Sequence, residues 1–232
     1  QNREARQQWI ADISHELRTP LSILQGELES LQDGIRPMTT DTINSLHNEV
    51  VHLNALVNDL HELSMSDQGA LIYKKVPVDL QSVFEMSRDM TQHLLDKHNI
   101  KLTIGFKSRS GDDGIQILGD ENRLLQLFDN LFQNTCRYTD EGGELVINFR
   151  QNNGLVVIEW YDSKPGVTDD DLSHLFGRLY RVDVSRNRKK GGSGLGLAIC
   201  KNIIEAHGGS VRAEHSSLGG LKIIIQISGI PD

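Results

Sequence analysis

The sequence has little of several features that mark common protein classes. Two cysteines among 232 residues are too few for a disulfide framework, which excludes the small disulfide-stabilised secreted domains and favours a reducing compartment. No apolar run approaches the length of about 18 residues that a membrane-spanning helix needs. The first residues, QNREARQQW, are polar and do not resemble a secretory signal. What remains, with 38% hydrophobic and 24% charged residues, is a composition typical of a globular protein.

Positive charge is scarce at the start of the chain. Residues 1–67 hold four Lys or Arg against eleven Asp or Glu, a net charge of −7, whereas residues 68–232 hold twenty against twenty-one, a net charge of −1. Proteins that bind nucleic acids present a basic face to the phosphates. The acidic first segment therefore argues against a nucleic-acid partner.

Two amphipathic helices are predicted within residues 1–67. The apolar positions of the first helix recur at spacings of three, four or seven: Ile10, Ile13, Leu17, Leu24, Leu28 and Leu31. Gly34 and Pro37 break the pattern, and a nearly strict heptad then follows at Ile43, Leu46, Val50, Leu53, Val57 and Leu60. Two helices enclose little core, so we expect a helical hairpin that joins a second copy in a dimeric four-helix bundle. A hairpin docked on the rest of its own chain is the alternative.

The stretch SHELRTP lies inside the first predicted helix. Helical geometry places His15 roughly 200° around the axis from Ile13, so it should face solvent, with Thr19 on the same face and Glu16 beside it. Pro20 removes a backbone N–H and favours a local bend. A carboxylate that accepts the Nδ1 proton of an exposed imidazole leaves Nε2 free to act as a nucleophile. An ordinary surface histidine is the alternative, and it is the interpretation we adopt for His47, His52, His61, His93, His98, His174, His207 and His215.

Residues 78–232 alternate between helical and strand-like patterns after a predicted linker at residues 68–77, which contains Gly69 and Pro77. The strand-like runs alternate apolar and polar residues, as a sheet with one covered face requires. We therefore predict an α/β sandwich in which helices pack on one face of a mixed sheet. The helical patterns cover about residues 79–98, 121–138, 169–180 and 195–207, and the strand-like runs are IKLTIGF, GIQIL, ELVINFR, LVVIEWY, SVRAEH and LKIIIQIS.

The stretch LFDNLFQNTCRYTD places polar side chains on one face of a predicted helix. Asn130, Asn134 and Arg137 lie at positions i, i+4 and i+7 of that helix. An asparagine amide oxygen is a suitable ligand for Mg²⁺, and an arginine can bind a phosphate directly. An ordinary polar helix surface is the alternative.

In YDSKPGVT, Asp162 ends a strongly apolar strand just before a Pro-Gly turn. A carboxylate in this position can accept a hydrogen bond from an exocyclic amine such as that of adenine. A turn aspartate without a ligand is the alternative.

The stretch KKGGSGLGLAIC contains four glycines within six residues and leads directly into an apolar helical pattern. Glycines allow the backbone to approach a ligand closely, and free N–H groups at a helix start favour phosphate. A basic segment precedes the glycines and could close over a polyphosphate as a lid, although a solvated loop is the alternative. Its charged residues are Arg178, Arg181, Asp183, Arg186, Arg188, Lys189 and Lys190.

Taken in order, these stretches resemble the motifs of sensor histidine kinases. ISHELRTPLS is similar to the phospho-acceptor box, NLFQNTCRYT to the asparagine box, and DSKPG and GGSGLGLAI to the glycine boxes, with LFGRLYR between them. The resemblance covers essentially the whole chain. It implies a dimerisation and phosphotransfer hairpin at residues 1–67, a linker at 68–77, and a catalytic domain at 78–232 with the sandwich fold shared by gyrase, Hsp90 and MutL.

The resemblance also implies roles for single residues. His15 is similar to the residue that takes the γ-phosphoryl group, Glu16 to its acid/base partner, and Thr19 to the residue that orients water when such kinases dephosphorylate their partner. Asn134 resembles the Mg²⁺ ligand, and Asp162 the carboxylate that binds adenine. The remaining implied nucleotide contacts are Asn130, Arg137, Tyr138, Gly166, Arg178, Arg181, Gly192, Ser193, Gly194, Leu195 and Gly196, with Gly219 and Gly220 as a later glycine pair.

The function that the resemblance implies is two-component signalling in bacteria. It comprises autophosphorylation of His15 from ATP and Mg²⁺ in a homodimer, transfer to an aspartate in the receiver domain of a response regulator, and phosphatase activity toward that partner. Envelope stress is the expected stimulus class. The expected location is the cytoplasmic face of the inner membrane, with the sensor and membrane-spanning part outside this sequence.

Three residues depart from the family pattern. Lys164 stands where the family usually has glycine, and we expect its side chain to crowd the base pocket or change the turn. Gly177 and Leu179 stand where Glu and Phe are common.

Two other functions are kept open. An ATPase of the gyrase or Hsp90 kind would not need SHELRTP, and a non-catalytic scaffold would not bind ATP.

Overall fold

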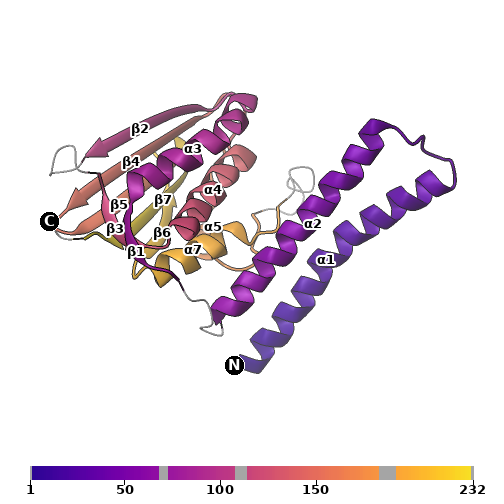
Figure 1. Ribbon diagram of the computed structural model, residues 1–232, viewed down its shortest axis with the longest axis horizontal. Helices are drawn as coiled ribbons and strands as arrows, with labels where there is room; N and C mark the ends of the chain where they lie inside the picture. Colours follow the sequence, from indigo (N-terminus) through magenta and orange to yellow (C-terminus); the bar gives the residue numbers. More distant parts are fainter. Residues whose placement is uncertain (1, 68–72, 108–113, 183–191, 231–232) are drawn as a thin grey trace. The chain divides into compact units, whose positions relative to one another are not determined.

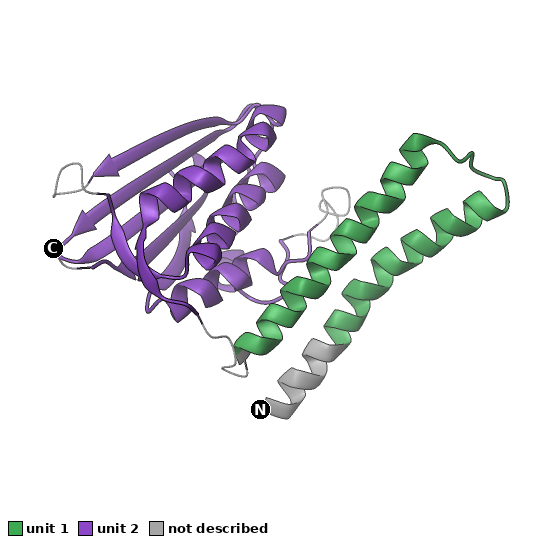
Figure 2. Cartoon of the chain, viewed as in Figure 1, with its two compact units in different colours: residues 1–70 green, residues 71–232 purple. Residues whose placement is uncertain are grey.

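The computed structural model describes residues 2–67, 73–107, 114–182 and 192–230. The chain divides into two compact units, Gln1–Ala70 and Leu71–Asp232 (Figure 2). The division falls inside the predicted linker, of which residues 68–72 lie outside the described part. No helix in the described ranges has both the length and the apolar character needed to cross a membrane.

The first unit is the predicted helical hairpin (Figure 1). It consists of α1 (Asn2–Gln32) and α2 (Thr40–Asp67), with Gly34 in the left-handed region at φ 69° in the turn between them. The Thr39 hydroxyl accepts the backbone N–H of Thr42 at 3.2 Å and so caps the start of α2. Pro20 is buried and lies inside α1 without ending it.

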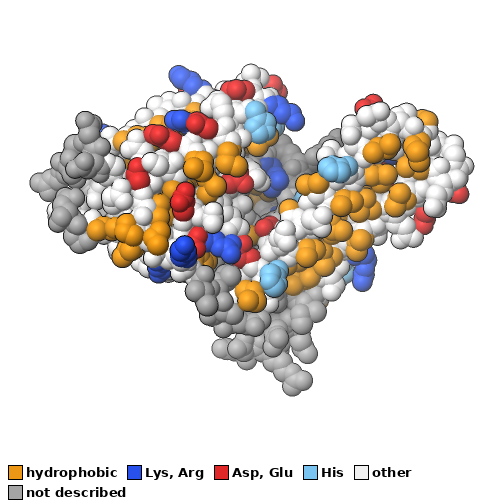
Figure 3. Space-filling view, in the orientation of Figure 1, with side chains coloured by type: hydrophobic (Ala, Val, Ile, Leu, Met, Phe, Trp, Pro, Cys, Tyr) orange, Lys and Arg blue, Asp and Glu red, His pale blue; other side chains and the backbone are white. Residues whose placement is uncertain are grey.

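The hairpin carries more apolar surface than one chain covers. Ile43, Val50 and Val57 of the predicted heptad are 53%, 44% and 48% exposed, whereas Leu60 is buried. Leu46 and Leu53, the alternate positions of the same heptad, are half-buried, so one chain covers only part of the predicted seam. The other large apolar side chains exposed on the hairpin are Leu21, Ile23, Leu28, Ile35, Met38 and Val51, and Figure 3 shows apolar side chains along its visible face.

The second unit is the predicted α/β sandwich. Its main sheet has the strand order β2-β4-β5-β7-β6, in which β2 and β4 pair in parallel and the other neighbours are antiparallel. A second, two-stranded sheet is formed by β1 and β3. The strand bounds are β1 (Val76–Asp79), β2 (Lys101–Lys107), β3 (Gln116–Gly119), β4 (Glu144–Asn152), β5 (Leu155–Ser163), β6 (Ser210–His215) and β7 (Gly219–Ser228).

Three helices cover one face of the main sheet (Figure 1). They are α3 (Leu80–Lys97), α4 (Glu121–Tyr138) and α7 (Gly196–Ala206), and each lies within two residues of its predicted range. Val156, Ile158 and Trp160 of β5 are buried on the covered face. The indole N–H of Trp160 donates to the Thr135 hydroxyl of α4 at 2.9 Å, which pairs its one polar atom inside the core.

Two local predictions differ from the structure. Strand β1 begins at Val76, inside the predicted linker, because residues 76–79 pair with residues 116–119 of β3. Helix α5 (Asp169–His174) ends six residues before the predicted 180. The Gly177 N–H donates to the His174 carbonyl at 2.7 Å, and Leu179 has a positive φ of 58°, so the chain turns there. Most of the predicted basic lid, residues 183–191, lies outside the described residues.

Candidate functional site

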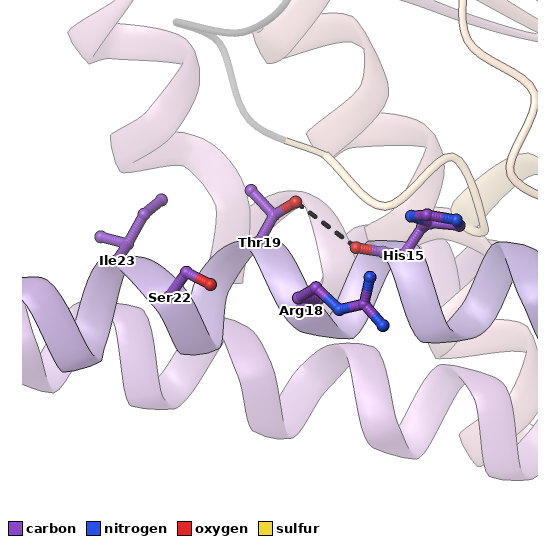
Figure 4. A pocket seen from close by; sticks show the side chains of 5 residues that line it. All are labelled: His15, Arg18, Thr19, Ser22 and Ile23. Carbon is purple, nitrogen blue, oxygen red and sulfur yellow. Dashed lines mark hydrogen bonds between the residues drawn. The ribbon is translucent and has the colours of Figure 1, made fainter.

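His15 lies exposed on α1, which confirms the outward orientation predicted from its place opposite Ile13. It borders a surface hollow whose other lining residues are Arg18, Thr19, Ser22 and Ile23 (Figure 4). Figure 4 shows the imidazole and the Arg18 guanidinium projecting from neighbouring turns of the helix. The hollow thus combines an imidazole, a cation and two hydroxyl groups, a set suited to an anionic group.

The helix backbone at His15 has an altered hydrogen-bond pattern. Pro20 has no N–H, so the Glu16 carbonyl lacks its usual helical donor. The Thr19 hydroxyl turns back along the helix and donates to the His15 carbonyl at 3.4 Å. Glu16 is half-buried beside this segment. The three residues predicted to act together therefore lie within one turn of α1.

Asp162 is a buried carboxylate next to the last residue of β5, at the strand end where the sequence placed it. It is 5% exposed, and its Oδ1 accepts the backbone N–H of Leu221 at 2.5 Å. Burial raises the pKa of Asp162 to about 7, while the Leu221 N–H acts in the opposite direction. A carboxyl group with so few partners retains capacity for a further donor.

Glycine at position 220 allows the backbone to pass directly over this carboxylate. A Cβ on Gly220 would lie 2.4 Å from Asp162 Oδ1 and 2.2 Å from the Ser163 carbonyl oxygen. A Cβ on Gly166 would lie 3.0 Å from the Gly219 carbonyl oxygen, so the turn after β5 also packs tightly on the start of β7. Larger residues do not fit at Gly220 without a shift of the backbone.

Lys164 follows Asp162 in the turn and is exposed. The described non-glycine residues with positive φ are Asn99, Asn153 and Leu179, so lysine at position 164 causes no backbone strain. The lysine stem lies against Gly219, since a Cβ there would meet Lys164 Cγ at 3.1 Å. Its predicted effect on the base pocket stays a prediction.

Helix α4 brings its polar face to the glycine-rich segment. Asn130, Asn134, Arg137 and Tyr138 are all half-buried. The Arg137 guanidinium packs on Gly192, where a Cβ would lie 2.7 Å from Nη1, and the Asn130 amide faces Gly196, where a Cβ would lie 3.8 Å from Oδ1. The Asn130 Nδ2 is buried and has no hydrogen-bond partner within the described residues. A buried amide without a partner fits a ligand that supplies an acceptor, such as a phosphate oxygen.

The glycine-rich segment leads into an uncapped helix start. Gly194 has a φ of 68°, and a Cβ there would lie 2.8 Å from the Leu179 carbonyl carbon. The Ser193 hydroxyl accepts the N–H of Leu195 at 3.3 Å, and Leu195 itself is buried. Within the described residues, no side chain caps the first N–H groups of α7. These groups can therefore bind an anion.

Arg178 is exposed and Arg181 half-buried, both beyond α5, and the further basic residues of this segment lie outside the described ranges. Tyr180, between them, is held by its hydroxyl, which donates to Asp171 Oδ1 at 2.7 Å. Of the predicted site residues on the second unit, the structure thus joins Asn130 and Arg137 to the glycine segment and Asp162 to the Gly219-Gly220 pair.

The sequence interpretation missed Thr139. This residue follows α4, and its buried hydroxyl has no partner among the described residues. The next residue, Asp140, donates its N–H to the Lys164 carbonyl at 2.9 Å, so Thr139 lies where the end of α4 adjoins the turn after Asp162. The signal in the sequence that could have pointed to Thr139 is its place directly after the helix that carries Asn130 and Asn134.

No group of three or more His, Cys, Asp or Glu residues able to hold a metal occurs within the described ranges. A metal at this site would therefore depend on asparagine oxygens and on the ligand itself. Asn134 and Asn130 offer amide oxygens of the kind that suits Mg²⁺ bound together with phosphates. The donor set fits that ion.

Two family models match the chain one after the other. Residues 5–69 match the His Kinase A (phospho-acceptor) domain, and residues 119–229 match the histidine kinase-, DNA gyrase B-, and HSP90-like ATPase. The chain is 50% identical over 226 residues to the signal transduction histidine-protein kinase BaeS of Escherichia coli strain K12, an alignment that covers 97% of this chain and 47% of BaeS. The chain thus spans about half the length of this relative.

Two solved structures share the arrangement of elements. The Acinetobacter baumannii histidine kinase AdeS matches with a TM-score of 0.77 and 27% identity, over 92% of this chain and 97% of that one. The histidine kinase ThkA, solved in complex with the response regulator protein TrrA, matches in fold with a TM-score of 0.75 and 23% identity, over 100% of this chain and 65% of that one. Both matches extend across the hairpin and the sandwich.

Proposed function

Because the chain belongs to the sensor histidine kinases, we propose that it transfers the γ-phosphoryl group of ATP to His15 and then to an aspartate of a response regulator. The observation that carries this proposal is the exposed imidazole of His15 on the hairpin of a chain that also holds the buried carboxylate Asp162. The buried carboxylate alone would also fit an ATPase, and the exposed imidazole is the element that an ATPase would not need.

Adenine recognition is assigned to Asp162. Its carboxylate accepts one donor from the protein, the Leu221 N–H, and can accept the exocyclic amine of adenine as a second. Because residue 220 is a glycine, no Cβ crowds Oδ1 of this carboxylate. Gly166 shapes the turn beside it. The buried position makes the hydrogen bond selective, since a base without a donor would leave the carboxylate unpaired.

Phosphate binding is assigned to α4 and the start of α7. The unpartnered Nδ2 of Asn130, the Arg137 guanidinium and the first N–H groups of α7 all supply donors at the glycine segment. The further residues assigned to this role are Tyr138, Arg178, Arg181, Gly192, Ser193, Gly194, Leu195 and Gly196. Asn134 would hold Mg²⁺, which when bound neutralises charge on the phosphate oxygens.

The chemical step is assigned to His15. Glu16 accepts the Nδ1 proton, and the Nε2 lone pair attacks the γ-phosphorus while the bond from that phosphorus to the β,γ-bridging oxygen breaks and ADP leaves. Protein groups contribute mainly by positioning the imidazole and neutralising charge. The hollow beside His15 places the Arg18 guanidinium and the Thr19 hydroxyl at the same surface, where they can meet the transferred group.

The partner is assigned as the receiver domain of a response regulator, whose aspartate takes the phosphoryl group from His15. The complex of ThkA with TrrA supports this choice by its shared fold. Thr19 is assigned to the phosphatase activity, in which it orients water for dephosphorylation of the response regulator. The 50% identity to BaeS supports an envelope-stress pathway and a position at the cytoplasmic face of a bacterial inner membrane.

A homodimer is the proposed assembly. The exposed residues Ile43, Val50 and Val57 form a stripe at heptad spacing, which a second hairpin would cover in a four-helix bundle. The domain division of residues 1–67, 68–77 and 78–232 also stays a proposal, with β1 starting two residues before the third range.

The experiment that tests the function incubates the chain with γ-labelled ATP and Mg²⁺ and compares it with His15→Gln. We expect acid-labile, base-stable label on the wild-type chain and none on the variant, while both bind a fluorescent ATP analogue equally. Equal label on both chains would defeat the kinase assignment. Steady release of phosphate without label would favour a gyrase- or Hsp90-like ATPase, and absence of nucleotide binding would favour a scaffold.

A further inference from the structure

A buried histidine joins the end of α7 to the start of α4. His207 is 6% exposed, which overturns the expectation of an ordinary surface histidine. Its Nδ1 lies 2.7 Å from the Ile203 carbonyl oxygen, and its Nε2 accepts the backbone N–H of Asp120 at 3.0 Å. A carbonyl requires a donor and an N–H requires an acceptor, so the ring is neutral with its proton on Nδ1.

Asp120 extends this contact to the chain that enters the second unit. One carboxylate oxygen of Asp120 caps α4 by accepting the Arg123 N–H at 3.3 Å. The other accepts the backbone N–H of Lys74 at 2.9 Å. The Tyr73 ring packs edge-on against His207 with 5.6 Å between centroids. Tyr73 and Lys74 are therefore fixed to the contact formed by His207 and Asp120, which we call the tether anchor.

The tether anchor lies at one end of the helix pair whose other end forms the candidate phosphate site. His207 meets Asp120 where α7 ends and α4 begins. Further along the pair, Gly196 faces Asn130 of α4, and Gly192 beyond the start of α7 faces Arg137. The helices thus run antiparallel, and their buried sides are part of one core. A chain held at the tether anchor is held to the same rigid body as the phosphate-binding residues.

The tether anchor also determines how many residues lie between the last residue of α2 and the first anchored residue of the second unit. Helix α2 ends at Asp67, so the five residues 68–72 separate it from Tyr73. The next residue that the second unit holds by strand pairing is Val76 at the start of β1, and eight residues, 68–75, separate it from the end of α2. Three more residues lengthen the reach of an extended chain by about 10 Å.

We propose that His207 is a positioning residue for phosphorylation of His15: with Asp120 it fixes Tyr73 and Lys74, and so sets the length of the tether by which the ATP-binding unit is carried to its histidine. This inference rests on the proposed kinase function. The effective concentration of the γ-phosphate at His15 falls as the tether grows beyond the length that matches the span. His207 does not touch the reacting atoms.

Protonation of His207 offers a way to open the tether anchor without a mutation. A proton on Nε2 would turn the acceptor into a donor facing the Asp120 N–H. Burial lowers the pKa of His207, and the nearby charge of Lys75 lowers it further, while the Ile203 carbonyl and Asp120 act in the opposite direction. Arg123 adds a second cation over the Tyr73 ring, with its guanidinium carbon 5.8 Å from the ring centroid. Release therefore requires acid below the ordinary range of histidine.

The test uses the full chain and two variants that open the tether anchor from different sides. His207→Phe keeps a flat ring and removes the acceptor, and Tyr73→Ala removes the packed ring without entering the helix pair. The matched control is His93→Phe, which changes an exposed histidine of α3 whose Nδ1 also lies near a backbone carbonyl, that of Met90 at 3.1 Å. Hydrogen exchange of the Lys74 amide reports the anchor, the rate of His15 labelling at saturating ATP reports delivery, and nucleotide titration reports the site.

Both variants should lose amide protection at Lys74 by at least about tenfold, as expected for loss of a hydrogen bond to a charged group. Labelling of His15 should slow at least about twofold, the factor that a −3/2 power gives for a tether growing from five to eight residues. The Kd for nucleotide and the KM for ATP should stay within about twofold of wild type, since the far ends of α4 and α7 are untouched. His93→Phe should match wild type throughout.

Acid should reproduce one effect of the variants, the loss of protection of the Lys74 amide. Protection of its amide, corrected for intrinsic exchange, should fall in the wild-type chain only as pH drops below the ordinary histidine pKa of about 6.5, and stay flat in His207→Phe. If His207→Phe does not fold, Tyr73→Ala decides the matter. Retained protection in the variants, or lost protection with wild-type labelling, would overturn the proposal. A wild-type chain that takes no label would instead defeat the kinase function, and Lys74 protection would still test the anchor.

Discussion

The hairpin and the sandwich differ in how far their functional groups are exposed to solvent. The hairpin places His15 on its surface and leaves Ile43, Val50 and Val57 in water, whereas the sandwich buries Asp162 and the Asn130 amide among packed residues. An exposed nucleophile can serve two successive partners, and buried polar groups can select one ligand. The hairpin therefore needs little internal precision, while the sandwich depends on close packing at single atoms.

The largest expected effect concerns Gly220, where that packing is closest. Gly220→Ala would place a Cβ 2.2 Å from the Ser163 carbonyl oxygen, so the backbone of β5 or β7 must move. We expect the free energy of unfolding of the sandwich to fall by about 4–5 kcal/mol, and nucleotide binding to be lost. Denaturant titration followed by Trp160 fluorescence, in a Trp9→Phe background, measures this. An unchanged midpoint would show that the sandwich tolerates a side chain over Asp162.

The second expected effect is a pH dependence of the stability of the sandwich. The native pKa of Asp162 is raised to about 7 from 3.8, so between these values the native state holds a proton that the unfolded chain has lost. Stability must then decrease as pH rises from about 4 to about 7, by up to about 4 kcal/mol, and stay level above. Asp162→Asn should remove this slope, be more stable than wild type at pH 8, and lose ATP binding. Unfolding curves at several pH values check the slope. Parallel curves for the two proteins would contradict it.

The third effect belongs to the hairpin. Val50→Glu places a charge in the exposed heptad stripe, and we expect the dimer Kd to rise at least about 100-fold because two carboxylates would be buried at the interface. The helical content of the hairpin should change little. Sedimentation at several concentrations measures the association, with the exposed neighbour Asn48→Glu as the matched control. Equal loss of dimer in both variants would argue that net charge, and not the stripe, sets assembly.

The smallest effect compares a glycine of the hairpin with Gly220. A Cβ on Gly26 of α1 would meet no atom within 4 Å in one chain. Alanine at a helix interior position favours the helix by about 0.5–1 kcal/mol relative to glycine. Gly26→Ala should therefore raise the melting temperature of the hairpin slightly. A lower value would place Gly26 at a close approach of the second copy.

The elements that the sequence predicted best were those with strong local patterns. Helix α4 has the predicted range 121–138, because its apolar side is continuous and Asp120 caps it. The exposure of His15 followed from its angle to Ile13 alone. In each case the signal lies within a few residues of the feature, so no tertiary contact was needed to see it.

The features that the sequence did not reveal depend on distant partners. Residues 76 and 77 resembled a linker because Pro77 is rare in central strands, and only pairing with β3 makes them part of a strand. His207 resembled a surface residue until Asp120, 87 positions away, supplied its N–H. The heptad of α2 did not show which of its residues are covered within one chain, since spacing alone does not say which neighbour covers each residue.

The exposed stripe of α2 bears on how the stability of the hairpin depends on protein concentration. In the proposed homodimer, in which a second hairpin covers Ile43, Val50 and Val57, the stability of each hairpin would rise with protein concentration. Dilution would then lower the free energy of unfolding of the hairpin. Each copy would be less stable in a cell that makes fewer copies.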